Sequence, residues 1–217
     1  MSFVTIMKYI LLFLVFISGY YIQAQRYTPI NYLGIGVEAT SYRLDIDDLT
    51  VDSNLGYKFV LETRGQIRDD FDFIYSLGVY NHNFSTRELL TNQEIEFSQL
   101  GAELNFLFAW KIAQSNHFSI ELGPSLLFNG DYKLKDESAF ENSQIGSLSN
   151  TITVSEFQKN NPFNVNGVIG FSTGVTHFRF MAHYHYGFLN NLSGQDNLGN
   201  DLEGKARFYT FGLRFYF

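Results

Sequence analysis

The stretch that decides the fold closes the chain, and it reads Lys205-Ala206-Arg207-Phe208-Tyr209-Thr210-Phe211-Gly212-Leu213-Arg214-Phe215-Tyr216-Phe217. Alternate residues fall into two sets, and a period of two is the pattern of a β-strand whose faces have different surroundings. One face is mixed and carries a charge, whereas the other is apolar throughout and consists of Tyr209, Phe211, Leu213, Phe215 and Phe217. The combination indicates a strand with lipid on one side and a filled barrel interior on the other.

Seven earlier segments repeat this alternation, and the connections between them are long and short in turn. An up-and-down barrel with an even number of strands has this layout, with short turns on one side of the membrane and longer loops on the other. We therefore predict an all-β fold, an eight-stranded antiparallel up-and-down transmembrane β-barrel. The predicted strands are residues 32–40, 56–64, 70–80, 96–110, 117–128, 162–173, 177–188 and 205–217.

The connections carry expectations of their own. Residues 41–54 and 81–94 are polar and are predicted to be loops. Residues 129–161 form the longest connection, with a mobile tip predicted at residues 136–150. Pro124 cannot donate to a strand ladder, so it could mark a bulge in the fifth strand.

The amino terminus has the pattern of a secretory signal peptide. Lys8 precedes an apolar run that is too short to span a membrane comfortably and is interrupted by Gly19. A retained membrane helix is the alternative interpretation. We predict a cleaved signal peptide at residues 1–24, a short periplasmic segment at residues 25–31, an outer-membrane barrel at residues 32–217, and a location in the cell outer membrane.

The composition excludes several classes of protein. The 217 residues include 23 Phe, 14 Tyr and no Cys, which rules out disulfides, cysteine-ligated metals and a lipidated cysteine anchor. The formal net charge of −7, on a chain predicted to be exported, argues against nucleic-acid partners.

The predicted inward face of the strands carries many charged residues, and acids and bases alternate near the short turns. An eight-stranded barrel is just wide enough for its own side chains, and a buried charge is tolerated only when it is paired. A selectivity filter or a proton path is the functional interpretation, and simple filling of the lumen is the structural one. We predict a lumen charge network that plugs the periplasmic half, formed by Glu62, Arg64, Asp72, Glu103, Glu121, Arg179 and Arg214.

Two other groupings could carry chemistry. His183 and His185 place two imidazoles on one inward face, but no cysteine and no obvious carboxylate completes a metal site. His82, Ser85 and the acids of the first two loops could form a hydrolase or acyl-transfer site at the outer rim, although their spacing does not demand it. We therefore predict no metal, no cofactor and no catalytic residues.

The chain resembles the PorT-like outer-membrane β-barrel proteins over nearly all of residues 30–217. The resemblance rests on Ala24-Gln25, on glycine-punctuated strands such as Leu33-Gly34-Ile35-Gly36-Val37-Glu38, Leu77-Gly78 and Leu122-Gly123, and on the closing Phe211-Gly212-Leu213-Arg214-Phe215-Tyr216-Phe217. It implies an outer-membrane barrel. The named member of that family takes part in type IX secretion and gliding. The terminal aromatic residue resembles the signal by which the barrel-assembly machinery selects its clients.

The leading functional hypothesis is an outer-membrane barrel without catalysis that acts through extracellular loops, in surface interaction or envelope support. The alternatives are a component or accessory of a type IX-like secretion machine, a narrow pore for small polar solutes, a lipid-modifying or proteolytic enzyme, and a soluble lipocalin-like barrel. The expected partners are outer-membrane lipid and, during insertion, the barrel-assembly machinery. An extracellular ligand and a secretion-machine partner remain open candidates.

Overall fold

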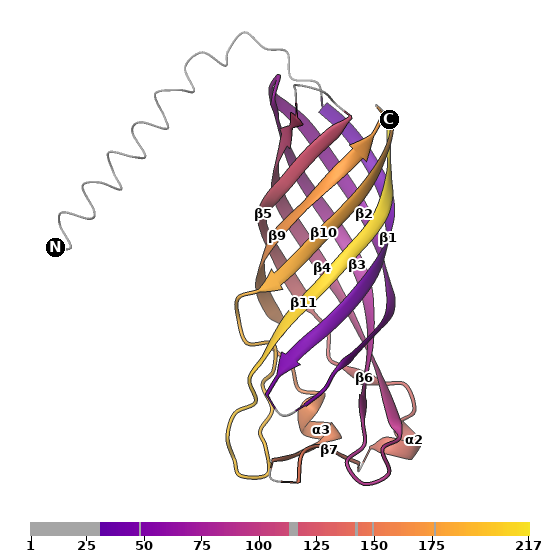
Figure 1. Cartoon of the computed structure of the whole chain (residues 1–217), viewed down its shortest axis with the longest axis vertical. Helices are drawn as coiled ribbons and strands as arrows, with labels where there is room; N and C mark the ends of the chain where they lie inside the picture. The colour runs from indigo at the N-terminus through magenta and orange to yellow at the C-terminus, as the bar shows by residue number, and fades with distance from the viewer. Residues whose placement is uncertain (1–30, 48, 113–116, 142, 149, 176) are drawn as a thin grey trace, which may run out of the picture.

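Eight long strands form the cylinder in Figure 1, a computed structural model that describes residues 31–47, 49–112, 117–141, 143–148, 150–175 and 177–217. The predicted signal peptide at residues 1–24 and residues 25–30 of the predicted periplasmic segment lie outside the described residues. The barrel strands are β1 (Asn31–Ile46), β2 (Asp52–Arg68), β3 (Phe71–Arg87), β4 (Glu94–Lys111), β5 (Phe118–Asn129), β9 (Phe163–Gly174), β10 (Phe178–Gly187) and β11 (Gly204–Tyr216).

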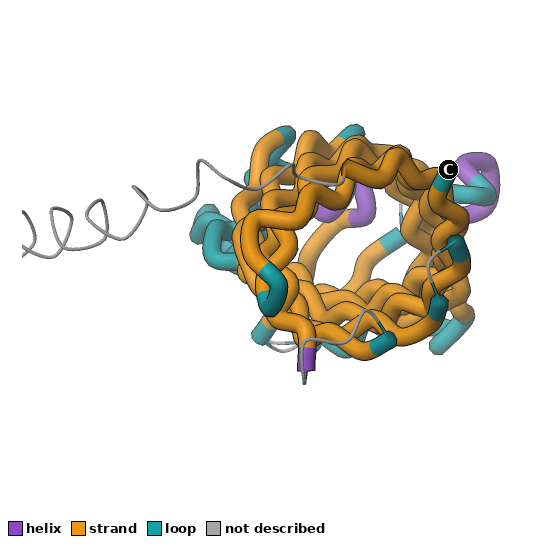
Figure 2. Tube along the Cα trace, turned by 90° about the horizontal axis from the view of Figure 1, so that it is seen from above, coloured by secondary structure: helices purple, strands orange, loops and turns teal. Residues whose placement is uncertain are grey.

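The sheet closes on itself. Each barrel strand pairs antiparallel with the next barrel strand along the chain, and β1 pairs with β11 in a ladder that runs from Gly34–Tyr216 to Ile46–Gly204. Seen along its axis, the sheet forms the ring in Figure 2. The predicted eight-stranded antiparallel up-and-down barrel is confirmed.

The two ends of the barrel differ. Short connections and the carboxy terminus lie at one end, at the top of Figure 1, which we call the turn end. Longer connections gather at the opposite end, which we call the loop end.

The first three strands extend further toward the loop end than the sequence predicted. β1 continues to Ile46, β2 begins at Asp52 and β3 continues to Arg87, so the loops predicted at residues 41–54 and 81–94 were wrong for most of their length. The physical reason is the polarity of the outward face, which near the loop end faces water instead of lipid. Inward residues such as Tyr42 and Leu44 continue the alternation and are buried.

The connection from β5 to β9 carries secondary structure. It contains β6 (Lys133–Leu134), α2 (Glu137–Phe140), β7 (Gln144–Gly146), β8 (Thr151–Thr153) and α3 (Val154–Phe157). The tip at residues 136–150, expected to be mobile, thus includes α2 and β7, and Ile145 of β7 is fully buried. Apolar residues among polar neighbours, such as Ile145 and Ile152, pack into the loop end and hold the β5–β9 connection against it.

Pro124 causes no bulge. It lies opposite Gly167 in a continuous ladder between β5 and β9, and its side chain is exposed. The ladder from β4 to β5 keeps one register on both sides of it, from Asn105–Ser125 to Phe108–Leu122. A proline whose missing N–H costs one ladder bond can therefore be accommodated without an extra residue.

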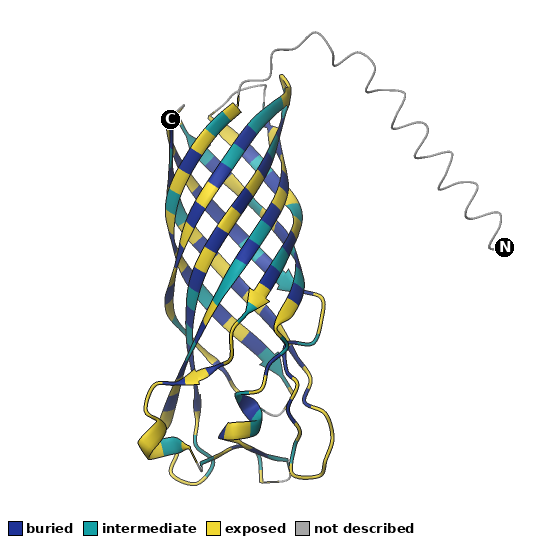
Figure 3. Cartoon of the chain, turned by 180° about the vertical axis from the view of Figure 1, so that it is seen from behind, coloured by how far each residue is buried: buried dark blue, intermediate teal, exposed yellow. Residues whose placement is uncertain are grey.

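Burial alternates along every barrel strand, which gives the checkerboard in Figure 3. Most outward residues are exposed or partly exposed and most inward residues are buried, as expected for a barrel with a filled interior. Ala182 on the outward face of β10 is an exception, being 8% exposed. Within the described residues, no helix is long and apolar enough to cross a membrane.

Candidate functional site

The barrel interior is the candidate site, because it holds the buried charged groups of the described residues. Five carboxylates and five bases with permanent charge lie inside it, each at most 6% exposed, so their formal charges balance. We call this set the ionic layer. Its members are Glu38, Lys58, Glu62, Arg64, Asp72, Glu103, Lys111, Glu121, Arg179 and Arg214.

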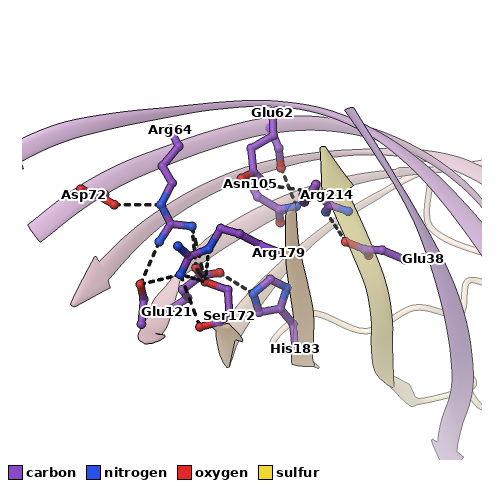
Figure 4. A network of polar contacts seen from close by, with 12 residues as sticks. Glu38, Glu62, Arg64, Asp72, Asn105, Glu121, Ser172, Arg179, His183 and Arg214 are labelled. Atoms are coloured by element: carbon purple, nitrogen blue, oxygen red, sulfur yellow. Dashed lines mark hydrogen bonds and ion pairs between the residues drawn. The ribbon is translucent and has the colours of Figure 1, made fainter. Parts of the chain in front are cut away.

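One branch of the ionic layer is centred on Arg64 of β2 (Figure 4). Its Nε donates to Asp72 Oδ2 at 2.8 Å, and its Nη1 donates to Glu121 Oε1 at 3.0 Å. Lys111 Nζ lies 2.9 Å from the other Asp72 oxygen, and His183 Nε2 forms a 2.8 Å hydrogen bond with the other Glu121 oxygen. Both carboxylates are therefore held on both of their oxygens, which is what a buried charge requires.

The second branch is centred on Arg214 of β11. Its Nε donates to Glu62 Oε2 at 3.1 Å, and its Nη2 donates to Glu38. Lys58 Nζ continues the branch, at 2.7 Å from Glu38 Oε2 and 3.0 Å from Glu103 Oε1. The resulting chain of alternating charge spans strands β1, β2, β4 and β11.

Arg179 joins the ionic layer through hydroxyl groups. Its Nε donates to Ser172 Oγ at 3.2 Å and its Nη2 donates to Ser119 Oγ at 3.1 Å. Ser172 Oγ in turn donates to Glu121 Oε1 at 2.5 Å. Arg179 thus reaches the Arg64 branch through neutral bridges (Figure 4).

Two glycines make room for the long charged side chains. A Cβ at Gly36 would collide with the Arg214 side chain, and a Cβ at Gly212 would collide with the Glu38 side chain. The ion pair that crosses between β1 and β11 therefore favours glycine at both positions, as does the backbone of the partner strand, because Val37 O and Leu213 O would also collide with the added Cβ atoms.

The structure places all seven residues of the sequence-predicted network inside the barrel and brings them together with three further charged residues. Lys111 was missed because it was assigned to a connection, whereas it ends β4. Glu38 and Lys58 were recognised as inward but were left out of the network. They are direct partners in the β1–β2 ladder, whose register was hidden because residues 41–54 between the two strands were predicted to be a loop.

Aromatic rings enclose His82 on the loop-end side of the ionic layer. The ring lies between those of Tyr42 and Tyr80, with centroids 4.7 and 4.3 Å away, and its Nδ1 is 3.0 Å from Thr40 Oγ1. His82 is therefore inside the lumen and not at the outer rim, whereas Ser85 donates to Glu94. The rim site considered for a hydrolase or acyl transferase is not assembled by these two residues.

His183 and His185 also have separate roles. His183 binds Glu121, while His185 stacks on Phe208 with ring centroids 4.1 Å apart. The two imidazole rings are 6.3 Å apart. Across the part of the chain that the structure describes, no three His, Cys, Asp or Glu residues are grouped so that they could hold a metal ion.

A second filling closes the loop end, and it is apolar. The rings of Phe84, Phe97 and Phe157 pack with centroids 5.1–6.4 Å apart, and Tyr132 packs on Phe157 at 5.8 Å. Burial raises the pKa of Tyr132 to about 12. We call this cluster the hydrophobic cap, and it comprises Tyr42, Leu44, Phe84, Ile95, Phe97, Tyr132, Leu134, Ile145, Ile152, Val154, Phe157, Leu192 and Leu202.

The outer surface of the barrel is the reverse of its interior. Large apolar side chains that are 37–77% exposed occur on the outward face of all eight barrel strands, and the single Trp, Trp110, is among them. We call this surface the apolar belt. Its members include Ile35, Phe59, Leu77, Phe108, Leu122, Ile169, Phe178 and Leu213, one from each strand.

Several solved structures are similar to this chain at low sequence identity. Neisserial surface protein A has 12% identity and a TM-score of 0.47, covering 85% of this chain and 97% of its own. Ail, the attachment invasion locus protein of Yersinia pestis, has 15% identity and a TM-score of 0.49, and the match covers 86% of this chain and 99% of Ail. The outer membrane protein OprG from Pseudomonas aeruginosa has 14% identity and a TM-score of 0.44, and the match covers 87% of this chain and 95% of OprG. At such identities the similarity concerns the fold alone.

No protein-family model matches the chain, and no curated protein matches it either. The resemblance to PorT-like proteins therefore stays a prediction.

Proposed function

We propose that this protein is an outer-membrane β-barrel without catalysis, that its lumen is closed, and that it acts through the loops at its loop end. The apolar belt supports the membrane location. Exposed apolar surface that continues around every strand is not tolerated in water, and a closed barrel is the β-structure that lipid accepts.

The observation that carries the closed lumen is its filling from both ends by unlike side chains. The ionic layer fills the interior from the turn end, and the hydrophobic cap fills it at the loop end. A solute would have to displace paired charges and then packed aromatic rings, so each filling alone opposes passage.

The loop end has features of an interaction surface. Leu90, Leu148 and Leu198 stand on three different loops and are 81%, 85% and 70% exposed. Backbone hydrogen bonds tie these loops together, from Leu89 N to Gln144 O at 2.8 Å and from Asn197 N to Thr151 O at 3.0 Å. Exposed apolar residues on connected loops support a surface that meets a partner.

Recordings in planar lipid bilayers test the closed lumen. The purified protein should give no steady unitary conductance, and the same detergent without protein is the control. A large, steady conductance would overturn the closed lumen and favour the narrow pore. In that case Arg179→Gln and Arg214→Gln should change ion selectivity.

Action through the loops has a separate test. The triple variant L90S/L148S/L198S replaces all three leucines with serine. It should still insert as a barrel, but cells that display it should no longer attach to surfaces or to other cells. Leu55→Ser, which changes a residue that is 77% exposed on a barrel strand, is the matched control. Equal attachment by wild type and triple variant would remove these tips from the proposed function.

The resemblance to PorT-like proteins motivates the secretion alternative. Deleting the gene and comparing the proteins released by the two strains tests it directly. Loss of a set of exported proteins would favour a secretion accessory, and unchanged export would reject that role.

A further inference from the structure

The middle of the lumen contains buried polar side-chain atoms that no described protein group satisfies. Asn105 Oδ1, Ser125 Oγ, both amide atoms of Asn166 and both ring nitrogens of His185 have no hydrogen-bond partner among the described residues. All four side chains are at most 5% exposed. We call these four residues the middle layer.

The ladder registers place the four residues in one continuous arc. Asn105 of β4 is the direct partner of Ser125 of β5, and Ser125 is the direct partner of Asn166 of β9. His185 of β10 is the partner of Val168, two residues from Asn166 on the same face. Partners on one face have Cβ atoms about 5 Å apart, so the side chains converge on a common space.

The arc borders both fillings of the lumen, and on β4 it adjoins the ionic layer directly, because the amide of Asn105 donates to Glu103. On β5, Ser125 follows the ionic-layer residue Glu121 and precedes Leu127 of the apolar cluster at the loop end. On β10, His185 is the next inward residue after His183, which binds Glu121. Anything held by the middle layer is therefore enclosed on both sides.

The chemistry of the unsatisfied atoms identifies what they bind. They include amide and hydroxyl oxygens, an amide NH₂ and an imidazole ring, so the ligand must both donate and accept hydrogen bonds. Reversing the Asn166 amide satisfies nothing, because both of its terminal atoms lack a partner. Buried polar groups without protein partners are normally bridged by ordered water that makes two to four hydrogen bonds.

We propose that Asn105, Ser125, Asn166 and His185 bind a cluster of ordered water molecules in the middle of the closed lumen. The cluster is a structural ligand of the barrel, because it satisfies groups that four adjacent strands bury around one space. Its exchange with bulk water is slow because both exits are blocked. The proposal does not depend on what the loops bind.

Nuclear magnetic resonance of the wild-type protein in phosphatidylcholine nanodiscs tests the proposal. The protein carries ¹⁵N-labelled asparagine. In a rotating-frame experiment, the Asn166 side-chain amide should give a cross-peak with water that arises from cross-relaxation and therefore has the opposite sign to a cross-peak from chemical exchange. The matched reference is Asn164 on the same strand, whose amide donates to Asn191 Oδ1 at 2.8 Å and to Leu189 O at 3.3 Å. Absence of cross-relaxation at Asn166 would overturn the water cluster.

A pair of substitutions gives an independent test through the sign of its effect. Asn164→Leu removes an amide that the protein satisfies, so its urea midpoint should fall. If water satisfies Asn166, Asn166→Leu should lower the midpoint by a similar amount, on the order of 0.5 M. If the middle layer is dry, Asn166→Leu removes an unpaired amide and should raise the midpoint.

A raised or unchanged midpoint for Asn166→Leu overturns the proposal when cross-relaxation is also absent. The wild-type cross-relaxation decides the matter if the two readouts disagree or if a variant fails to fold.

Discussion

The two fillings of the barrel close the same cylinder with opposite chemistry. The ionic layer consists of side chains from the strands themselves, and most of its charges depend on an opposite charge beside them. The hydrophobic cap consists of side chains from strand ends and loops, and each contributes buried apolar area. A layer of paired charges is stable only as a whole, whereas an apolar cluster loses stability in proportion to what is removed.

The difference follows from the connections at each end. Short turns at the turn end supply no extra chain, so the interior there must be filled by long side chains that reach across from the strands. Long loops at the loop end supply α3 and the β7–β8 pair, whose apolar residues cover the opening. The length of the connections thus selects the chemistry of each filling.

The largest expected effect comes from removing one charge of the ionic layer. Arg214→Met leaves Glu62 buried without a charged partner and Glu38 with Lys58 alone, and we expect a loss of about 3–5 kcal/mol in the free energy of unfolding. Urea unfolding in lipid vesicles measures the loss, with Trp110 as the only tryptophan reporter. Adding Glu62→Gln should recover part of it, because one unpaired charge is then removed. A loss below about 1 kcal/mol would mean that the lumen rehydrates the carboxylates.

The hydrophobic cap should respond to truncation locally. Phe157 of α3 is fully buried against Phe97 and Tyr132, so Phe157→Ala should cost about 3 kcal/mol of cap stability through lost burial and the cavity that remains. Hydrogen exchange across residues 131–158 should become faster while the Trp110 unfolding transition stays in place. Leu148→Ala, at an exposed site of the same loop, is the control. A shift of the whole transition would show that cap and barrel unfold as one unit.

Alkaline pH should loosen the cap. The pKa of Tyr132 is about 12 in the folded protein and about 10 in the unfolded chain, so the unfolded chain ionises first. The contribution of the buried Tyr132 hydroxyl to the free energy of unfolding is complete below pH 10. It decreases as the pH rises toward 12, and the loss at pH 11 is about 1.4 kcal/mol. Resistance of residues 131–158 to an alkaline protease between pH 9 and pH 11 measures the effect. Tyr132→Phe should make the resistance less dependent on pH, and an unchanged profile would contradict the assignment.

The contrast between the two fillings also explains what the sequence could predict. Alternation is a local property, and along β11 it is enough to assign Leu213 to the outward face and Arg214 to the inward face. The eight strands and the inward position of all seven network residues follow from it. Which charges meet depends on register between strands far apart in sequence, as for Glu38 and Arg214, and alternation fixes that register only to within shifts of two residues.

The cap was harder to predict because its residues are separated by polar tips and belong to different loops. Phe84, Phe157 and Leu192 gather only when β3, α3 and the last long loop meet in space. Outward residues there face water, so the two-sided signal of the apolar belt is missing. Predicted loops at residues 41–54 and 81–94 were wrong for the same reason.

The smallest expected effect belongs to an ion pair of similar geometry outside the ionic layer. Arg207 Nε lies 2.6 Å from Asp45 Oδ2, closer than Arg214 Nε lies to Glu62 at 3.1 Å. The Arg207 side chain is 45% exposed, however, and that of Arg214 only 2%. Water compensates an exposed charge, so Arg207→Gln should cost less than about 1 kcal/mol in the same urea assay, and added salt should reduce the cost further. If Arg207→Gln cost as much as Arg214→Met, burial would not be what makes the ionic layer cohesive.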